Sequence, residues 1–269
     1  MTTRAKVTLT PEQETLLITL YAKAQPDNPL FFDPTARDIL NRVDYDFARL
    51  RVPYKTVVLV CQRAGKLDTV TRRFLAEQPD GVVVQLGCGL DTRFFRVDDG
   101  RVAWYDLDMP PVIELRRRFF SEGGRYRMIA ASVTDHEWMD TVTSGGRPVL
   151  VVAEGLLMYL GKSDVRRLLL RLRETFPDCR LVADVFSRLA ARSAARHPSL
   201  KSTGATIGWG IDDPRELESW GPGIRLLEEW FFSDDPNLSR LNWAYRLAYK
   251  LAGAFKMVRR AHRVVVYQL

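Results

Sequence analysis

Short apolar runs alternate with amphipathic segments from residue 81 to the C-terminus. The runs are rich in Val, Ile and Leu and bounded by turn residues, which predicts strands at residues 82–86, 102–107, 126–130, 149–153, 180–185, 224–231 and 263–267. Helical patterns between them cover residues 111–121, 164–175, 186–196 and 238–255. Strands this apolar, separated by helices, are typical of an α/β fold with a mostly parallel, seven-stranded sheet covered by helices on both faces.

The first part of the chain has a different pattern. Leu16, Leu17 and Leu20 recur at helical spacing, and further helices are predicted at residues 35–42 and 57–76. The Pro79-Asp80-Gly81 turn then leads into the first strand. We therefore expect an N-terminal helical extension at residues 1–80 and an α/β domain at 81–269.

Residues 197–223 interrupt the alternation between the fifth and sixth strands. The segment is rich in Gly, Ser, Thr and Trp, and α/β enzymes often build substrate sites from long loops at this edge of the sheet. Trp209 and Trp220 would either line an apolar pocket there or pack this lid-like insert onto the sheet.

A glycine turn ends the first strand. Gly87-Cys88-Gly89 follows the apolar run, which is the arrangement of a nucleotide-binding turn. The second strand carries Asp106 and Asp108, where such folds hold a ribose hydroxyl. A nucleoside-containing cofactor is therefore expected.

The residue three positions after Gly89 helps to decide which cofactor is bound. A dinucleotide fingerprint has a third glycine, and this chain has Thr92 at that position. S-adenosylmethionine (SAM) carries no phosphate and needs only the first tight turn. A nicotinamide-dependent oxidoreductase is the alternative, and NADH binding would distinguish the two.

Three segments in register resemble the leucine carboxyl methyltransferase family, and more closely its bacterial branch of tetracenomycin polyketide O-methyltransferase-like proteins. They are Leu-Gly-Cys-Gly-Leu-Asp-Thr-Arg from residue 86, Trp-Tyr-Asp-Leu-Asp-Met-Pro-Pro from 104 and Ala-Glu-Gly-Leu-Leu-Met-Tyr-Leu from 153. The resemblance runs from about residue 21 to the C-terminus. It implies a Rossmann-like class I SAM-dependent methyltransferase whose last strand is antiparallel.

The resemblance also implies which residues hold the cofactor. Asp108 would contact the ribose, Glu154 the amino group, and Arg63 the carboxylate, with Asp106 assisting or pairing with an arginine. The full set of expected cofactor-binding residues is Lys23, Arg63, Gly87, Cys88, Gly89, Asp106, Asp108, Ser132, Val133, Asp135 and Glu154. Cys88 is expected to be a small buried filler, and Arg93 to brace the glycine loop.

The catalytic machinery is expected to be sparse, because the sulfonium already makes the methyl carbon electrophilic. Glu154, Tyr159 and His136 are the catalytic candidates. His136, His197 and His262 are isolated in the sequence, so no metal site is expected. The lack of an evident base favours a carboxylate or an acidified phenol as the acceptor.

The net charge of +7 raises the possibility of an acidic partner such as RNA. The arginine clusters lie in helical patterns beside Leu or Val, so solvated helix faces explain them more simply. Three scattered cysteines suggest a reducing cytoplasm. No apolar run is long enough to span a membrane, so no membrane partner is expected, and the sequence leaves the oligomeric state open.

Taken together, these features predict a cytoplasmic SAM-dependent O-methyltransferase. Its acceptor would be a carboxyl or phenolic oxygen of a small molecule of the polyketide or secondary-metabolite type. The alternative is methylation of a protein C-terminal carboxylate, with methylation of RNA ranked after it.

Overall fold

The computed structural model describes residues 5–6, 11–194 and 207–269 of the chain. Its centre is a seven-stranded sheet in the order β5-β4-β3-β6-β7-β9-β8. The strands are β3 (Val82–Leu86), β4 (Ala103–Asp108), β5 (Tyr126–Ala130), β6 (Val149–Ala153), β7 (Cys179–Phe186), β8 (Arg225–Phe231) and β9 (His262–Gln268). β3 to β7 pair in parallel, and β9 pairs antiparallel with both β7 and β8. The predicted sheet and its antiparallel last strand are confirmed.

From β3 the next strands along the chain, β4 and β5, are added on one side, whereas β6 and β7 are added on the other side. β3 pairs with β4 on one side and with β6 on the other, in register from Val82 to Leu86. In open α/β sheets the crevice for a ligand forms at this point, beyond the carboxyl ends of the strands.

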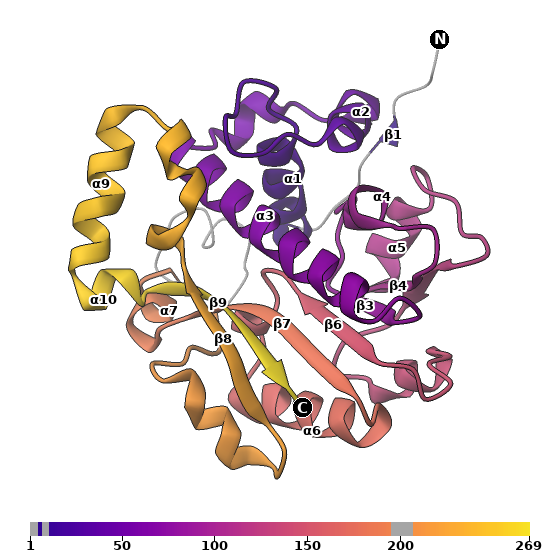
Figure 1. Ribbon diagram of the computed structural model, residues 1–269. Helices are drawn as coiled ribbons and strands as arrows, with labels where there is room; N and C mark the ends of the chain where they lie inside the picture. Colours follow the sequence, from indigo (N-terminus) through magenta and orange to yellow (C-terminus); the bar gives the residue numbers. More distant parts are fainter. Residues whose placement is uncertain (1–4, 7–10, 195–206) are drawn as a thin grey trace.

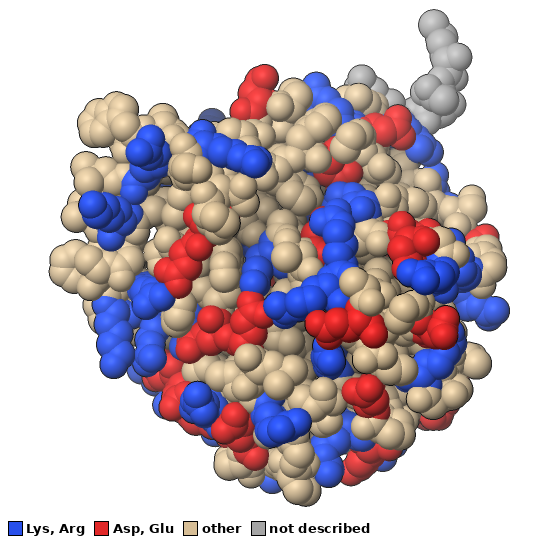
Figure 2. Space-filling view, in the orientation of Figure 1, with Lys and Arg blue, Asp and Glu red and all other residues tan. Residues whose placement is uncertain are grey.

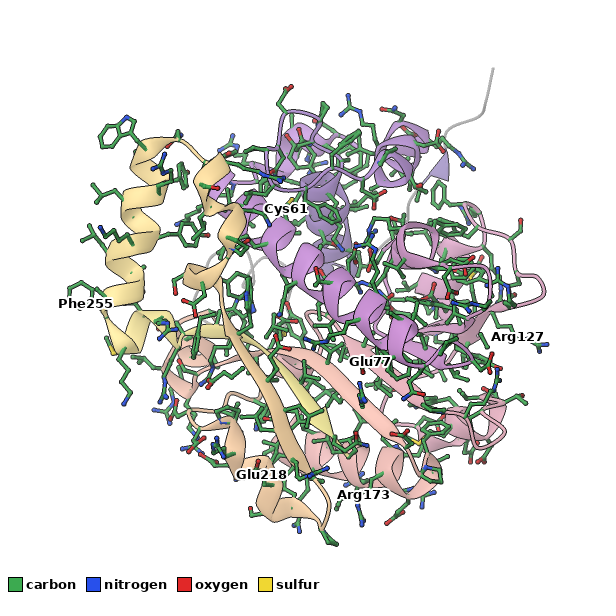
Figure 3. The ribbon with its side chains drawn as sticks, viewed as in Figure 1. Cys61, Glu77, Arg127, Arg173, Glu218 and Phe255 are labelled. Carbon is green, nitrogen blue, oxygen red and sulfur yellow. The ribbon has the colours of Figure 1, made fainter. Side chains whose placement is uncertain are left out.

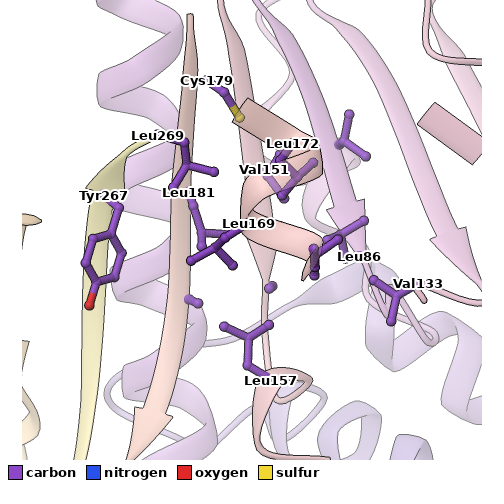
Figure 4. Packing of buried hydrophobic residues seen from close by; sticks show 14 of the residues in the cluster. Leu86, Val133, Val151, Leu157, Leu169, Leu172, Cys179, Leu181, Tyr267 and Leu269 are labelled. Atoms are coloured by element: carbon purple, nitrogen blue, oxygen red, sulfur yellow. The ribbon is translucent and has the colours of Figure 1, made fainter. Parts of the chain in front are cut away.

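One face of the sheet packs on α6 (Lys162–Thr175) and on the insert that follows β7. Leu168, Leu169 and Leu172 of the helix are fully buried against strand residues such as Val151 (Figure 4). Trp209 is buried in this core, and Trp220 packs against it. Of the two alternatives left open by the sequence, packing of the insert onto the sheet is the one that the burial of these tryptophans supports. Residues 195–206 of the insert lie outside the described part.

The other face is covered by N-terminal helices (Figure 1). These are α1 (Pro11–Lys23), α2 (Pro34–Arg42) and α3 (Tyr54–Glu77), and together with α4 (Arg93–Val97) they share one apolar core with β3, β6, β7 and β9. The residues before the sheet therefore pack directly on it.

Shorter elements complete the fold. They are β1 (Ala5–Lys6), β2 (Val43–Asp44), α5 (Pro110–Arg116), α7 (Arg188–Ala194), α9 (Trp243–Ala254), α10 (Lys256–Arg259), and the 3-10 helices η1 (Phe47–Leu50), η2 (His136–Thr141), η3 (Leu157–Tyr159), η4 (Pro214–Trp220), η5 (Phe232–Asp234) and η6 (Pro236–Arg240). β1 and β2 form a separate two-stranded pair that the sequence pattern did not predict. No helix in the described ranges is long and apolar enough to cross a bilayer.

Candidate active site

A cavity of about 250 Å³ lies where the strand order reverses. The ends of β3 and β6 form its floor, with Gly87, Gly89 and Glu154, and α1 and α3 close over it with Lys23 and Arg63. Apolar side chains complete the lining: Leu16, Ile18, Val60, Met158 and Phe186. The cavity thus has both ionic and apolar walls.

The glycine turn has a backbone that only glycine adopts readily. Gly87 and Gly89 have φ of 61° and 52°, in the left-handed region. A Cβ on Gly89 would stand 2.8 Å from Leu16 Cδ2 of α1, so the Leu16 side chain would have to shift. Between them, Cys88 is buried and burial raises the pKa of its thiol well above the ordinary value. Cys88 is therefore small and buried as expected; it also belongs to the cavity lining, and its contact with the cofactor remains a prediction.

Glu154 sits among three cations. Its carboxylate oxygens lie 3.1 Å from Arg63 Nε, 2.5 Å from Arg93 Nη2 and 3.3 Å from Lys23 Nζ. Burial alone would raise its pKa, but Lys23, Arg63 and Arg93 outweigh burial and hold the pKa of Glu154 at about 2. The group is a fixed negative charge at neutral pH.

Asp91 is a second fixed carboxylate in the cavity wall. Lys23 Nζ lies 3.1 Å from it, Arg93 Nη1 3.0 Å and Arg96 Nη1 3.1 Å. These cations, led by Arg93, hold the pKa of Asp91 well below its usual range against the opposing effect of burial. Sequence reasoning missed Asp91, although it follows the glycine turn directly.

Asp184, near the end of β7, is the second carboxylate besides Glu154 that binds the Arg63 guanidinium. It accepts hydrogen bonds from Arg63 Nη1 at 3.1 Å and from the Gly155 amide at 2.5 Å, and it bonds His262 Nε2 at 2.7 Å. The His262 ring lies between the rings of Phe186 and Phe232, at 4.4 and 4.5 Å. Burial lowers the pKa of His262 despite Asp184, so the imidazole is neutral at pH 7. Neither residue was expected here.

The ion pairs form one connected network. Arg96 and Arg93 extend it to Asp68, and Arg96 also reaches Asp33. Among the described residues the network joins five carboxylates (Asp33, Asp68, Asp91, Glu154 and Asp184) to four cations (Lys23, Arg63, Arg93 and Arg96). With His262 neutral, the network carries one excess negative charge. Arg93 braces the loop as expected.

Asp106 is not in the cavity, which corrects its assignment to the cofactor. Its carboxylate is fully buried and accepts hydrogen bonds from Trp104 Nε1 at 2.8 Å, from the Tyr126 hydroxyl at 2.7 Å and from Arg116. Arg116 also donates to the Gly89 carbonyl at 2.9 Å. Asp106 therefore supports the glycine turn from behind, through the arginine partner that the sequence anticipated.

Asp108 lies beside the turn, outside the cavity lining. Its two oxygens accept hydrogen bonds from the amides of Gly89 and Met109, at 2.8 and 2.7 Å. The loop after β5 adjoins it, since the Ala131 amide donates to the Asp108 carbonyl at 3.0 Å. This loop holds Ser132, Val133 and Asp135, none of which lines the cavity. Cofactor contacts by these four residues remain predictions.

Two catalytic candidates besides Glu154 have different outcomes. Tyr159 lines the cavity, and burial raises the pKa of its phenol. His136 does not line it: this residue begins η2, and its pKa is lowered by burial and then by Arg171 and Arg167 of α6. The structure therefore removes His136 from the candidate active site. No cluster of metal-ligating side chains occurs among the described residues.

Comparison with known proteins agrees with this arrangement. The family model for leucine carboxyl methyltransferase matches residues 15–173. The chain is 44% identical to the tetracenomycin polyketide synthesis O-methyltransferase TcmP of Streptomyces glaucescens, over 97% of this chain and 98% of that protein. It is 32% identical to the S-adenosyl-L-methionine-dependent methyltransferase dpfgK of Gibberella zeae, over 94% of each. A DUF574 family protein from Streptomyces avermitilis has the same fold, with a TM-score of 0.62 and 15% identity over 96% of this chain and 99% of that one. The chain therefore belongs to the leucine carboxyl methyltransferase family and is a SAM-dependent methyltransferase.

Proposed function

We propose that this enzyme transfers the methyl group of SAM to a carboxylate oxygen of an aromatic, polyketide-type small molecule. The near-full-length similarity to a protein named for tetracenomycin polyketide synthesis supports the acceptor class. The ionic state of the cavity supports the choice of oxygen, and it is the observation on which the proposal depends.

The lining fits the cofactor. The left-handed turn at Gly87 and Gly89 leaves bare backbone for the ligand, where a Cβ would intrude. Glu154 would bind the amino group, and Arg63 and Lys23 the carboxylate, by exchanging part of their present ion pairs. When bound, the cofactor supplies an electrophilic methyl carbon.

The apolar part of the lining would hold the acceptor. Val60, Met158 and Phe186 offer a surface against which a flat aromatic ring packs. Such packing excludes water and aligns the acceptor oxygen with the methyl group, and alignment supplies most of the rate in this kind of displacement.

No described residue of the lining is suited to remove a proton near neutral pH. Glu154 is held ionised by three cations, and the raised pKa of Tyr159 keeps its phenol protonated. His262 lies behind Phe186 and outside the lining. A carboxylate acceptor is already ionised above about pH 4–5 and needs no base, whereas a simple phenol has a pKa near 10.

The test uses an aromatic hydroxy acid that offers both oxygens to the enzyme, together with SAM labelled in the methyl group. We expect a labelled methyl ester, which mild alkali hydrolyses to methanol. We also expect kcat/KM to change little between neutral and moderately alkaline pH, because the acceptor's ionisation is complete.

An alkali-stable methyl ether, with kcat/KM rising as pH approaches the phenol's pKa, would show phenol methylation and overturn the choice of oxygen. Tyr159→Phe is the matched variant, since it keeps the ring and removes the hydroxyl. It should retain activity if no base is used, and a loss of turnover with unchanged cofactor affinity would assign Tyr159 a catalytic role.

A further inference from the structure

Helices α9 and α10 carry an apolar surface that the rest of the described structure leaves uncovered. We call it the outer face; its members are Trp243, Leu247, Leu251, Phe255, Met257 and Val258. Their exposed fractions run from 48% for Leu247 and Val258 to 74% for Trp243. Phe255 points away from the molecule, at the end of a helix that stands out from the body (Figure 3). Six large apolar side chains this exposed on adjoining helices indicate a binding surface.

The opposite side of α9 holds the helix to the protein. The Tyr245 ring meets the Tyr54 ring of α3 edge-on at 5.0 Å. Tyr249, one turn further along, is half-buried, whereas its neighbours Ala248 and Lys250 are exposed. The outer face is therefore presented by an anchored helix.

Positive charge accompanies the outer face. Residues 242–260 contain Arg246, Lys250, Lys256, Arg259 and Arg260, and no Asp or Glu. Within the described residues, Arg259 pairs with Asp234 at 2.6 Å, and the other four cations form no ion pair. Blue and tan side chains accordingly occupy the edge of the molecule formed by α9 and α10 (Figure 2).

We propose that the outer face docks onto an anionic lipid bilayer. A Trp-, Leu- and Phe-rich face flanked by Lys and Arg is the composition of helices that lie in the membrane interface, with rings among the acyl chains and cations at the phosphates. α9 has 12 residues and would lie along the surface. Charge disfavours a second copy of this chain as the occupant. A two-fold interface would bring together the four cations of each copy that form no ion pair among the described residues, with no acid in residues 242–260 to pair them.

Only a few residues of sequence separate the outer face from a side chain that contacts the cavity wall. α10 ends at Arg259, and three residues later His262 begins β9 and contacts the Phe186 ring in the cavity wall. The docking itself does not depend on the acceptor proposed above.

The experiment is co-sedimentation of the full-length protein with vesicles. One set contains phosphatidylcholine alone, and the other contains phosphatidylcholine mixed with phosphatidylglycerol. We expect at least ~tenfold more bound protein on the anionic vesicles at low salt, and a loss of this excess at high salt. Leu251→Glu should lose the binding, and so should the double change Lys250→Glu with Lys256→Glu.

Leu227→Glu is the matched control. Leu227 is 50% exposed on β8 and Leu251 is 54% exposed, so the two substitutions alter charge and exposed apolar area equally at different places. Equal binding by both lipid sets, or equal losses for Leu251→Glu and Leu227→Glu, would overturn the proposal. A wild-type dimer that Leu251→Glu converts to a monomer, without vesicle binding, would assign the outer face to a second copy.

Discussion

Arg63 joins the two sides of the candidate active site. It leaves α3 and reaches Glu154 after β6 and Asp184 at the end of β7, at 3.1 Å in each case. Gly155, between these partners, has φ of 63°, and a Cβ there would lie 3.2 Å from Arg63 Nη1. The backbone and both carboxylates therefore restrict the guanidinium to one place.

Replacing Arg63 by Ala should weaken the binding of S-adenosylhomocysteine by ~10–100-fold, because charge-assisted hydrogen bonds contribute about 1.5–3 kcal/mol each. Isothermal titration calorimetry measures this directly. Arg73→Ala is the control, since Arg73 lies on the same helix but pairs with Glu228 at the surface. If Arg63→Ala lowers only the thermal midpoint, the arginine has a structural role alone.

Some site residues were predictable from the chain and others were not. Gly87, Gly89 and Glu154 stand at the ends of apolar runs, so their place in the sheet implies their place in the cavity. Asp184 also ends a strand, but its importance comes from Arg63 and His262, which are distant in the sequence. The prediction that His136 is catalytic was wrong, because the ability of an imidazole to transfer protons does not indicate where its loop lies in the fold.

At the scale of elements, strands were predicted better than helices. Val82–Leu86, Tyr126–Ala130 and Val149–Ala153 match their predicted bounds. The first and third of these strands are buried along their whole length, and such strands are marked by nearly continuous apolar runs that end at turns. The helix predicted over residues 111–121 ends at Arg116, where the side chain turns inward to Asp106 and the Gly89 carbonyl. That helix end depends on tertiary contacts that local patterns do not contain.

α9 shows a related limit of pattern reasoning. Its apolar positions correctly predicted a helix. The predicted range was 238–255, and the observed helix is Trp243–Ala254. The large apolar side chains of this helix face outward, whereas Tyr245 and Tyr249 are partly buried and Tyr245 packs on Tyr54 of α3. An amphipathic pattern thus identifies an apolar stripe without specifying what covers it.

For the molecule as a whole, the buried carboxylates set a pH limit on stability. Glu154, Asp91 and Asp184 all have folded-state pKa values below their ordinary ones. Protons therefore bind the unfolded chain more readily, and the stability from these groups is complete above about pH 5 and lost as pH falls toward 2. Glu154 alone, with a pKa of about 2 against 4.5, corresponds to roughly 3 kcal/mol.

Urea unfolding at a series of pH values between neutral and about 3 checks this expectation. The free energy of unfolding should fall steadily over the acid part of the range. In Glu154→Gln the fall should be shallower, whereas Glu114→Gln, at an exposed helix position, should follow the wild type. Parallel curves for wild type and Glu154→Gln would contradict the assignment.

The excess negative charge of the ion network makes the cavity sensitive to the progress of the reaction. SAM carries a net positive charge from its sulfonium, and S-adenosylhomocysteine has none. Methyl transfer removes this positive charge, so we expect the negatively charged network to bind the spent cofactor less tightly than SAM. Sinefungin, which has an ammonium in place of the sulfonium, should bind more tightly than S-adenosylhomocysteine at low salt, and equal affinities in calorimetry would refute the idea. A lower affinity for the uncharged product would favour its release after each methyl transfer.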